Sequence, residues 1–490
     1  MSKGITKKSE NHSKWYTDVV TKAELADYGP VKGTMVIRPY GYAIWELVKN
    51  EFDNQFKATG HSNAYFPLFI PKSFLSKEAE HVEGFAKECA IVTHSRLMMD
   101  ENSNSIVVDP TSKLEEEIIV RPTSETVIWH MYKKWINSYR DLPILINQWA
   151  NVVRWEMRTR LFLRTSEFLW QEGHTAHSTE EEAREETLKI LDIYKNVCNT
   201  HLAMPVLTGK KTESEKFAGA VDTYCIEAMM GDKRALQAGT SHYLGQNFAK
   251  AFDVKFQTEN NTEEYVYASS WGVSTRLIGG IIMVHGDDNG LRLPPSVAPI
   301  QVVVVPFFKT DKELELIKNY IGSQLDQLKK ENIRIFFDER DKISPGFKFN
   351  EWELKGVPLR LEIGNKEIEN NEVTLFRRDL LNKETISIEN FSPKIISRLD
   401  EIQDNLFSQA NNFMDSNIHQ VSTYEEFKDI ISSGGFVRCG WDGTTETENI
   451  IKNETKATIR CIPFNKSLSN IKCIRTGNDA PHEVIFAKAY

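Results

Sequence analysis

Residues 148–156 read Gln-Trp-Ala-Asn-Val-Val-Arg-Trp-Glu, and after a charged loop residues 164–168 read Arg-Thr-Ser-Glu-Phe. Strand residues two apart point to the same face, so the pattern predicts Arg154 and Glu156 on one side of a strand. A guanidinium suits phosphate or carboxylate, and a carboxylate beside it can accept from an adenine amino group. The second stretch adds another cation and an aromatic plane on which a base can stack. The alternative interpretation is a solvated strand pair with ion pairs on its outer face.

The segments around this motif mix helices and strands without regular alternation. A helix is predicted over residues 40–59, because apolar residues recur there at helical spacing (Ile44, Val48, Phe52, Phe56) before Gly60. Ser178 with Glu181 three residues later is a capping-box pattern, which predicts a second helix to about residue 202. Strand-like stretches occupy residues 64–70, 117–121, 144–156 and 165–176. This order favours an α+β fold, an antiparallel sheet with helices packed on it, over a doubly wound fold.

A proline-rich seam separates this region from the rest of the chain. Residues 291–299 read Leu-Arg-Leu-Pro-Pro-Ser-Val-Ala-Pro, which excludes a helix, and an apolar strand follows at once. We therefore place a domain boundary near residue 297. Beyond it, strands at 300–305, 333–337 and 357–363 alternate with helices at 311–330 and 346–355, which predicts a small α/β domain. The expected parts are a flexible tail (1–14), a first domain (15–297), an α/β domain (298–400) and a small, irregular α/β C-terminal domain (401–490).

Composition narrows the classes of function. The chain has 490 residues, 40% of them hydrophobic and 26% charged, as in ordinary globular proteins. It contains no run of about eighteen apolar residues, and the polar start at 1–14 lacks the apolar stretch of a signal peptide, so a cytoplasmic location is expected. The net charge of −9 means that any nucleic acid must be bound by a local patch and by shape. Six scattered cysteines argue against a disulfide framework.

The Arg-x-Glu, loop, Arg-x-x-x-Phe pattern resembles motif 2 of the class II aminoacyl-tRNA synthetases. The resemblance implies that Arg154 grips the α-phosphate and the amino-acid carboxylate, while Glu156 contacts the adenine amino group. It further implies that Arg164 reaches the γ-phosphate and that Phe168 stacks on adenine. The helix ending near Gly60 and the strand after it resemble motif 1, the dimer-forming element, so a homodimer is expected.

Residues 270–276, Ser-Trp-Gly-Val-Ser-Thr-Arg, lead into an apolar helix at 277–284 and resemble motif 3, which would place Arg276 on the far side of ATP. The class generally has an acid just before that arginine, whereas Thr275 stands here. That departure is the form expected of the prolyl-tRNA synthetases. Other stretches resemble the same subgroup, namely residues 121–126, 148–156, 168–174, 237–242 and 244–248.

The resemblance also implies a set of substrate-binding residues. Proline's secondary ammonium needs acceptors, for which Thr123 and Glu125 are the candidates, and a carboxylate makes the stronger bond. Three planar side chains are candidates for the walls of a slot for the pyrrolidine ring, although each alone could be core packing: Trp170, His174 and His242. The ATP-binding candidates are Arg154, Glu156, Arg164, Thr165, Phe168, Gln237, Thr240, Ser274 and Arg276.

The implied chemistry is attack of the proline carboxylate on the α-phosphate of ATP, followed by transfer of proline to a tRNA ribose hydroxyl. The first step needs no protein nucleophile or general base. Positioning and charge neutralisation by Arg154, Arg164, Arg276 and Mg²⁺ would supply most of the acceleration, which makes Arg154 and Arg276 the catalytic candidates.

The α/β domain resembles the class II anticodon-binding domain through residues 338–341, Asp-Glu-Arg-Asp, and the stretch 344–360. Proline anticodons carry two successive guanines, and unstacked guanines call for carboxylates beside cations and for aromatic surface. For each candidate the alternative is a solvated amphipathic helix. The anticodon-binding candidates are Glu339, Arg340, Lys348, Glu351 and Lys355.

The C-terminal part departs from the resemblance. Many members of the family hold zinc there with two cysteine pairs, whereas Thr444 and Thr476 stand here where second cysteines would follow Cys439 and Cys473. Cys461 lies between them, and three separated thiols are a poor tetrahedral set, so no zinc or other structural metal is predicted. The final Tyr490 resembles the family's terminal tyrosine, whose carboxylate can reach back to the catalytic domain.

About a hundred residues separate the motif 2 and motif 3 arginines, which leaves no room for the large editing insertion of the bacterial-type branch. The resemblance is therefore to the archaeal and eukaryotic-type branch. Since each missing methylene contributes only about 1–3 kcal/mol of discrimination, alanine and cysteine should be misactivated. The alternatives are a threonyl- or histidyl-type ligase, which would show a metal-ligand set or another specificity loop, and a non-enzymatic paralogue that senses tRNA or amino acid and would have lost an ATP arginine.

Overall fold

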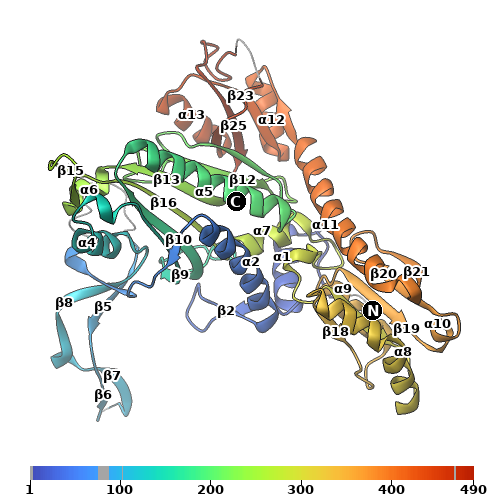
Figure 1. Cartoon of the computed structure of the whole chain (residues 1–490). Helices are drawn as coiled ribbons and strands as arrows, with labels where there is room; N and C mark the ends of the chain where they lie inside the picture. Colours follow the sequence, from blue (N-terminus) through green and yellow to red (C-terminus); the bar gives the residue numbers. More distant parts are fainter. Residues whose placement is uncertain (1–3, 75–87, 102, 468–470) are drawn as a thin grey trace.

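The computed structural model describes residues 4–74, 88–101, 103–467 and 471–490. Figure 1 shows a large central sheet with helices packed on it, an arm at one side, a second sheet, and a C-terminal unit that returns to the central sheet. Among the described residues, no helix combines the length and apolar character needed to cross a membrane.

The central sheet has eleven strands in the order β22-β23-β25-β24-β11-β12-β13-β16-β10-β9-β3, and most neighbours are antiparallel. The expectation of an antiparallel sheet covered by helices is therefore confirmed. Its seven strands from the first domain are β3 (Ser62–Asn63), β9 (Ile144–Val153), β10 (Glu167–His177), β11 (Val206–Lys210), β12 (Asp222–Met229), β13 (Ala235–Gly245) and β16 (Tyr267–Ser274).

Helices α2 (Pro39–Ala58) and α5 (Glu180–Thr200) match the two helices expected from the sequence. The predicted stripe on α2 is buried, and Gly60 beyond its end has a φ of 89°, which suits glycine. The predicted cap of α5 is wrong by one residue: Thr179 is the N-cap and accepts from the Glu182 backbone N–H at 3.2 Å. Other elements here are α1 (His12–Lys22), β1 (Ala26–Tyr28), β2 (Met35–Ile37), α4 (Glu125–Trp135), α6 (Asn247–Phe252), β14 (Lys255–Gln257) and β15 (Glu263–Tyr265).

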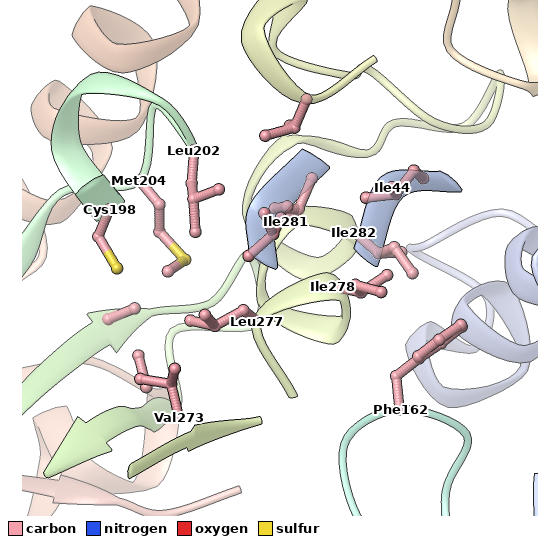
Figure 2. Close-up of a cluster of buried hydrophobic side chains, with 14 of the residues drawn as sticks. Ile44, Phe162, Cys198, Leu202, Met204, Val273, Leu277, Ile278, Ile281 and Ile282 are labelled. Atoms are coloured by element: carbon pink, nitrogen blue, oxygen red, sulfur yellow. The ribbon is translucent and has the colours of Figure 1, made fainter. Parts of the chain in front are cut away.

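Helix α7 (Arg276–His285) is anchored in the largest hydrophobic core, which fixes the residue at its N-terminus. Figure 2 shows its residues Leu277, Ile278 and Ile282 among side chains that include Ile44 of α2 and Cys198 of α5. All three α7 residues are at most 1% exposed. Since interiors are close-packed, this cluster leaves α7 little freedom to shift.

The arm projects from the central sheet (Figure 1). It contains a three-stranded sheet of β4 (Phe69–Pro71), β8 (Lys113–Val120) and β5 (Ala90–His94), and a hairpin of β6 (Leu97–Asp100) and β7 (Ser105–Val108). The hairpin exposes large apolar side chains, among them Leu97 and Ile106 at 68% each. The predicted strand at 64–70 is only partly right, because regular strand begins at Phe69.

The α/β domain has a five-stranded sheet in the order β18-β17-β19-β20-β21. Its helix α8 (Asp311–Lys330) has the predicted bounds, and α9 (Pro345–Leu354) differs by one residue at each end. The remaining elements are β17 (Val302–Pro306), β18 (Ile335–Phe337), β19 (Leu359–Ile363), α10 (Asn365–Glu369), β20 (Glu372–Arg377), β21 (Asn382–Ser387) and α11 (Phe391–Asp415).

The C-terminal part is regular, so the expectation of an irregular segment is wrong. It contains β22 (Ile418–Gln420), α12 (Tyr424–Ser433), β23 (Phe436–Trp441), α13 (Thr445–Thr455), β24 (Ala457–Pro463) and β25 (His482–Lys488). Strand β24 pairs with β11, which joins this unit to the central sheet. Position 400 lies inside α11, so one continuous helix, and not a linker, crosses the predicted boundary.

The predicted flexible tail is also wrong for the described residues 4–14. The hydroxyl and backbone N–H of Thr6 both donate to Asp18, at 2.7 and 2.8 Å, and the backbone N–H of Lys8 donates to Asp288 at 2.8 Å. Ile5 packs against the central core, and α1 begins at His12. Tertiary contacts hold this segment in place, and no local sequence pattern predicts them.

Candidate active site

A cavity of about 260 Å³ lies over the central sheet, and three neighbouring strands, β10, β16 and β13, supply most of its floor. Side chains two apart on a strand face the same way, so one strand can contribute several residues to one surface. The β10 residues that line the cavity are Phe168, Trp170, Glu172 and His174, and those of β16 include Ser270, Gly272 and Ser274.

One row across four strands forms the deep end of the cavity. His174 pairs in register with Ser270, Ser270 with His242, and His242 with Thr223. The Thr223 hydroxyl lies 3.0 Å from Nδ1 of His242, and burial, followed by the charge of His174, lowers the pKa of His242 to about 3. Within the described residues, Ser270 Oγ and His174 Nδ1 are buried without a hydrogen-bond partner. Such atoms are costly unless a ligand or water satisfies them, which marks this row as a binding surface.

An acidic group enters the cavity from the N-terminus of α4. Glu125 is the first residue of this helix and is 5% exposed, and the Thr123 hydroxyl donates to its carboxylate. Burial raises the pKa of Glu125 above its usual 4.5, although the neighbouring His174 and Arg154 oppose this. A carboxylate held in an apolar setting binds a cation strongly because the cation removes its desolvation penalty.

A second buried carboxylate, Glu172, lines the same cavity and is missing from the residues predicted from the sequence. It accepts from the Ser124 backbone N–H (3.2 Å) and from Nε2 of Gln148 (2.8 Å), and lies 3.1 Å from Nε2 of His174. Burial opposes its ionisation, but these hydrogen bonds and the charge of His174 lower the pKa of Glu172. The alternation of positions 168, 170, 172 and 174 on one strand was the signal that could have identified it.

Arg154 lies between the acidic end and the aromatic residues of the cavity. Its Nε donates to the Pro122 carbonyl at 3.0 Å, and its guanidinium lies 5.6 Å from the ring centre of Phe168 and 5.2 Å from that of Trp170. Burial lowers the pKa of Arg154 most, and the acids Glu125, Glu172 and Glu156 oppose that shift. A stacked and anchored guanidinium is already oriented for an anionic group.

The prediction that Arg154 and Glu156 share a strand face is wrong, because β9 ends at Val153. Arg154 points into the first cavity, whereas Glu156 lines an adjoining cavity of about 230 Å³. There Glu156 accepts from Nε of Arg164 at 2.7 Å. Two of the predicted ATP residues are therefore paired with each other in this structure.

The two cavities share Gln237 and Arg276, so they adjoin each other at these two residues. Nε of Arg276 donates to the Leu163 carbonyl at 3.1 Å and its Nη1 donates to the Gln237 carbonyl at 3.4 Å. The terminal Tyr490 lines the second cavity, and its backbone N–H donates to the Ala235 carbonyl at 3.0 Å. In Figure 1 the C-terminal mark accordingly lies over the central sheet.

A bulge in β13 brings Gln237 and Thr240 to the same face. Residues three apart on a regular strand would point to opposite faces. Here the register with β12 shifts, because Ile226 pairs with Gly239 and Glu227 pairs with Gln237, which leaves Ala238 unpaired. Bulges re-aim side chains in this way and are frequent next to active sites.

Two other predicted ATP residues differ in their placement. Ser274 lines the first cavity, and its hydroxyl accepts from the Arg276 backbone N–H at 3.2 Å. Thr165 is buried and donates to the Glu167 carbonyl at 2.7 Å, and it lines neither of the two cavities. Its side chain shapes the loop and does not face the site in this conformation.

The anticodon candidates lie on α9, at its C-cap and on the segment that precedes it. Arg340 forms a fork with Asp338, at 2.8 and 2.7 Å, and its Nη2 also donates to Glu351 at 2.9 Å. Glu339 is exposed and pairs with Lys318 at 2.8 Å. These are the partly exposed members of the predicted set.

The remaining two anticodon candidates are engaged inside the protein. Lys348 is buried and its amine donates to the Asp338 carbonyl at 2.8 Å, so the alternative of a solvated helix face does not hold for this residue. The amine of Lys355 pairs with Glu24 of the first domain at 2.7 Å and with Glu351 at 3.1 Å.

The C-terminal segment predicted to lack zinc is held by hydrogen bonds to one carboxylate. Asp442 accepts from the hydroxyls of Thr444 (2.9 Å), Thr447 (2.8 Å) and Thr476 (3.2 Å). The threonines that stand in place of the second cysteines therefore have a structural role of their own. In the described part of the chain, no cluster of three or more metal-ligating side chains occurs.

Comparison with known proteins decides the family. Three family models match: "tRNA synthetase class II core domain (G, H, P, S and T)" over residues 107–285, "Anticodon binding domain" over 301–398, and "Prolyl-tRNA synthetase, C-terminal" over 424–490. The chain is 58% identical to the proline–tRNA ligase of Bacteroides fragilis, covering 100% of this chain and 99% of that protein. The chain belongs to the prolyl-tRNA synthetase family. Its function is thus that of a proline–tRNA ligase with a class II catalytic core.

Other members of the prolyl-tRNA synthetase family support the same conclusion. The chain is 58% identical to the proline–tRNA ligase of Flavobacterium psychrophilum over the full length of both. The crystal structure of prolyl-tRNA synthetase from Cryptosporidium parvum, complexed with halofuginone and AMPPNP, matches with a TM-score of 0.92 and 38% identity, covering 100% of this chain and 98% of that one. The expected class II fold, anticodon-binding domain and C-terminal domain are therefore confirmed.

Proposed function

We propose that the two adjoining cavities bind L-proline and ATP side by side and form prolyl-adenylate between them. The main support for this proposal is that Glu125, Arg154 and Arg276 line one cavity of about 260 Å³. An acid for the amine, a guanidinium for the carboxylate and a guanidinium for phosphate are the groups that the first step requires. Proline lies at the acidic end, and ATP extends toward Tyr490.

Each end of this site has a defined task. Glu125 and Thr123 accept from the two N–H groups of the proline ammonium, while Trp170, His174 and His242 border the ring. Arg154 binds the attacking carboxylate and the α-phosphate, and Arg276 neutralises charge on the opposite side of the phosphate. Gln237, Thr240 and Ser274 contact the nucleotide, and Phe168 stacks on adenine. Mg²⁺ enters with ATP as part of the substrate.

Nucleotide binding breaks one ion pair in this proposal. Arg164 is bound to Glu156 in this structure and must release it to reach the γ-phosphate, which frees Glu156 for the adenine amino group. The pair is half exposed on the arginine side, so the cost of separating it is at most about 1 kcal/mol. Charge-assisted bonds to phosphate readily offset that cost.

The transfer step delivers proline to tRNA(Pro), and Glu339, Arg340 and Glu351 of the second domain contact the anticodon guanines. Their support is a partly exposed cluster of carboxylates beside a guanidinium, with exposed Phe347 on the same helix. Lys348 serves this surface indirectly, by holding Asp338.

The enzyme belongs to the archaeal and eukaryotic-type branch without a cis-editing insertion, and it misactivates alanine and cysteine. In support, the segment between Phe168 and Arg276 consists of α5, α6 and strands β10 to β16, so elements of the core occupy it throughout. Pyrophosphate exchange with each amino acid, together with hydrolysis of mischarged tRNA, tests this. Failure to detect exchange with either one contradicts it.

A homodimer in the cytoplasm is the working form. The arm hairpin β6–β7 exposes Leu97, Met99 and Ile106, and a two-stranded hairpin with such a surface gains stability when a second copy covers it. Sedimentation velocity tests the assembly, and a monomer at all concentrations of folded protein contradicts it.

The decisive assay is proline-dependent ATP–pyrophosphate exchange, with Glu125→Ala and Arg154→Ala as controls. Wild-type protein exchanges pyrophosphate efficiently when proline, ATP and Mg²⁺ are all present, and more slowly when alanine or cysteine replaces proline. The first variant loses affinity for proline, and the second loses turnover. No exchange by well-folded wild-type protein overturns the proposed function.

A further inference from the structure

A cation from the C-terminal part of the chain reaches the nucleotide side of the site. Arg460 on β24 lines the cavity of about 230 Å³, together with Arg164, Arg276 and Tyr490. The site as described so far draws its cations from the first domain alone. A guanidinium contributed by another part of the chain therefore needs an explanation.

Arg460 is fixed by a buried acid of the central sheet. Its Nη2 and Nε donate to the two carboxylate oxygens of Glu227, at 3.0 and 3.2 Å, and its Nη1 donates to the Thr458 hydroxyl at 2.9 Å. The amine of Lys211 donates to Glu227 at 2.8 Å and to the Arg460 carbonyl at 2.7 Å. Lys211, Glu227 and Arg460, here called the interdomain triad, are all buried.

The interdomain triad is linked to Arg276 through one residue, Gln237. Glu227 is the cross-strand partner of Gln237, and the Gln237 carbonyl accepts from Nη1 of Arg276 at 3.4 Å. Burial, then Arg154 and Arg164, lower the pKa of Arg276, whereas the charge of Glu227 opposes that shift. Glu227 is thus a buried carboxylate close enough to attract Arg276.

A buried carboxylate that loses a cationic partner attracts any other cation within reach, because an incompletely compensated buried charge is strongly destabilising. With Arg460 in place, both oxygens of Glu227 are occupied. Without it, Lys211 still donates to one oxygen of Glu227, and Arg276 of the same cavity is a guanidinium on which the charge of Glu227 already acts. Arg276 would then bind an acid when it should bind phosphate.

We propose that Arg460 is a positioning residue for ATP, which occupies both oxygens of Glu227 and so leaves Arg276 free for the phosphates. This rests on the proposed function, in which the nucleotide extends into the second cavity. The C-terminal part is thereby coupled to the first chemical step through a charge, in addition to its packing on the sheet.

The test compares three variants by pyrophosphate exchange: Arg460→Gln, the double variant Arg460→Gln with Glu227→Gln, and Arg438→Gln as a matched control. The control breaks another arginine–glutamate pair of the C-terminal part, between the partly buried Arg438 and the buried Glu483 at 2.6 Å, which lines neither cavity. It reports the effect of lost stability alone.

For Arg460→Gln the KM for ATP rises about tenfold, the KM for proline changes by less than about twofold, and Arg438→Gln leaves both constants unchanged. The double variant restores the net charge of the interdomain triad, so its KM for ATP returns to within about threefold of wild type. An unchanged KM for ATP in folded Arg460→Gln overturns the proposal. So does a double variant whose KM for ATP stays raised tenfold, which would mean that Arg460 binds ATP directly.

If Arg460→Gln fails to fold, the double variant decides the matter alone, because the proposal predicts a near-wild-type KM for ATP and direct binding predicts a raised one. A wild-type enzyme without any exchange would count against the proposed function. If the wild-type enzyme exchanges pyrophosphate normally and the KM for ATP is the same in the Arg460 variants, only the role of Arg460 is contradicted.

Discussion

The carboxylate of Glu125 offers the sharpest test of the proline end of the site. Glu125→Gln keeps the shape and removes the charge that the proline ammonium would meet. The side chain is 5% exposed and already accepts from Thr123, so little water is present to replace the lost interaction. A hydrogen bond to a charged group contributes about 1.5–3 kcal/mol. At 1.4 kcal/mol per factor of ten, the KM for proline should rise about 10- to 150-fold.

The assay is pyrophosphate exchange at varied proline and at varied ATP, so that the two KM values are separated. The KM for ATP should stay within about twofold of wild type, because Glu125 lines the first cavity and not the second. Refutation would be a KM for proline that changes by less than about threefold, or KM values for proline and ATP that rise together.

The same substitution has a predicted effect on stability, and its sign follows from the raised pKa of Glu125. A carboxyl whose pKa is raised on folding stabilises the fold below its unfolded pKa, and this contribution is lost as pH rises through the folded value. At pH 7 and without proline, the buried carboxylate therefore lowers the stability of the folded state. Glu125→Gln should melt at the same or a higher temperature than wild type, and a large fall in Tm would contradict this.

Three other predictions concern the same site. The KM for proline of the wild type should rise as pH falls through the raised pKa of Glu125, because the protonated carboxyl no longer attracts the ammonium. The KM of Glu125→Gln should not change over the same pH range, and parallel pH profiles of the two enzymes in exchange assays would contradict this. Gly272→Ala places a Cβ 3.2 Å from the Gln171 carbonyl and 3.6 Å from the Trp170 ring on the cavity floor. The KM for proline should therefore rise about tenfold while the KM for ATP stays unchanged. Equal affinity of the variant and the wild type for proline in calorimetry would refute this. A short extension beyond Tyr490 should raise the KM for ATP, because this residue lines the second cavity, whereas an extension at the N-terminus serves as the control; an active, unchanged C-terminal fusion would exclude this role.

Local patterns predicted most of the elements. The apolar stripe of α2 depends on neighbours within four positions, and both α2 and α8 lie where the sequence places them. Trp170 and His174 were candidates through the family resemblance, and period-two alternation explains why they share one face of β10. Applied to every position of that strand, the same rule would have included Glu172.

Other features depend on contacts between distant segments. Gln237 and Thr240 share a face only because of the bulge at Ala238, which has no local signature. Arg154 lies beyond the end of its strand, where alternation no longer holds. Lys348 looked exposed on a helix of weak amphipathic pattern but packs onto Asp338. The return of Tyr490 to the second cavity follows from pairing between the C-terminal strands and β11.

The most direct test of the account is a crystal structure with a non-hydrolysable prolyl-adenylate analogue. The account predicts that the ring nitrogen lies within hydrogen-bonding distance of Glu125 and Thr123, and that the phosphate-mimicking group lies between Arg154 and Arg276. It further predicts that Glu227 remains bound to Arg460. A ligand whose ring nitrogen faces away from Glu125, or whose phosphate mimic lies outside the reach of both arginines, would contradict it.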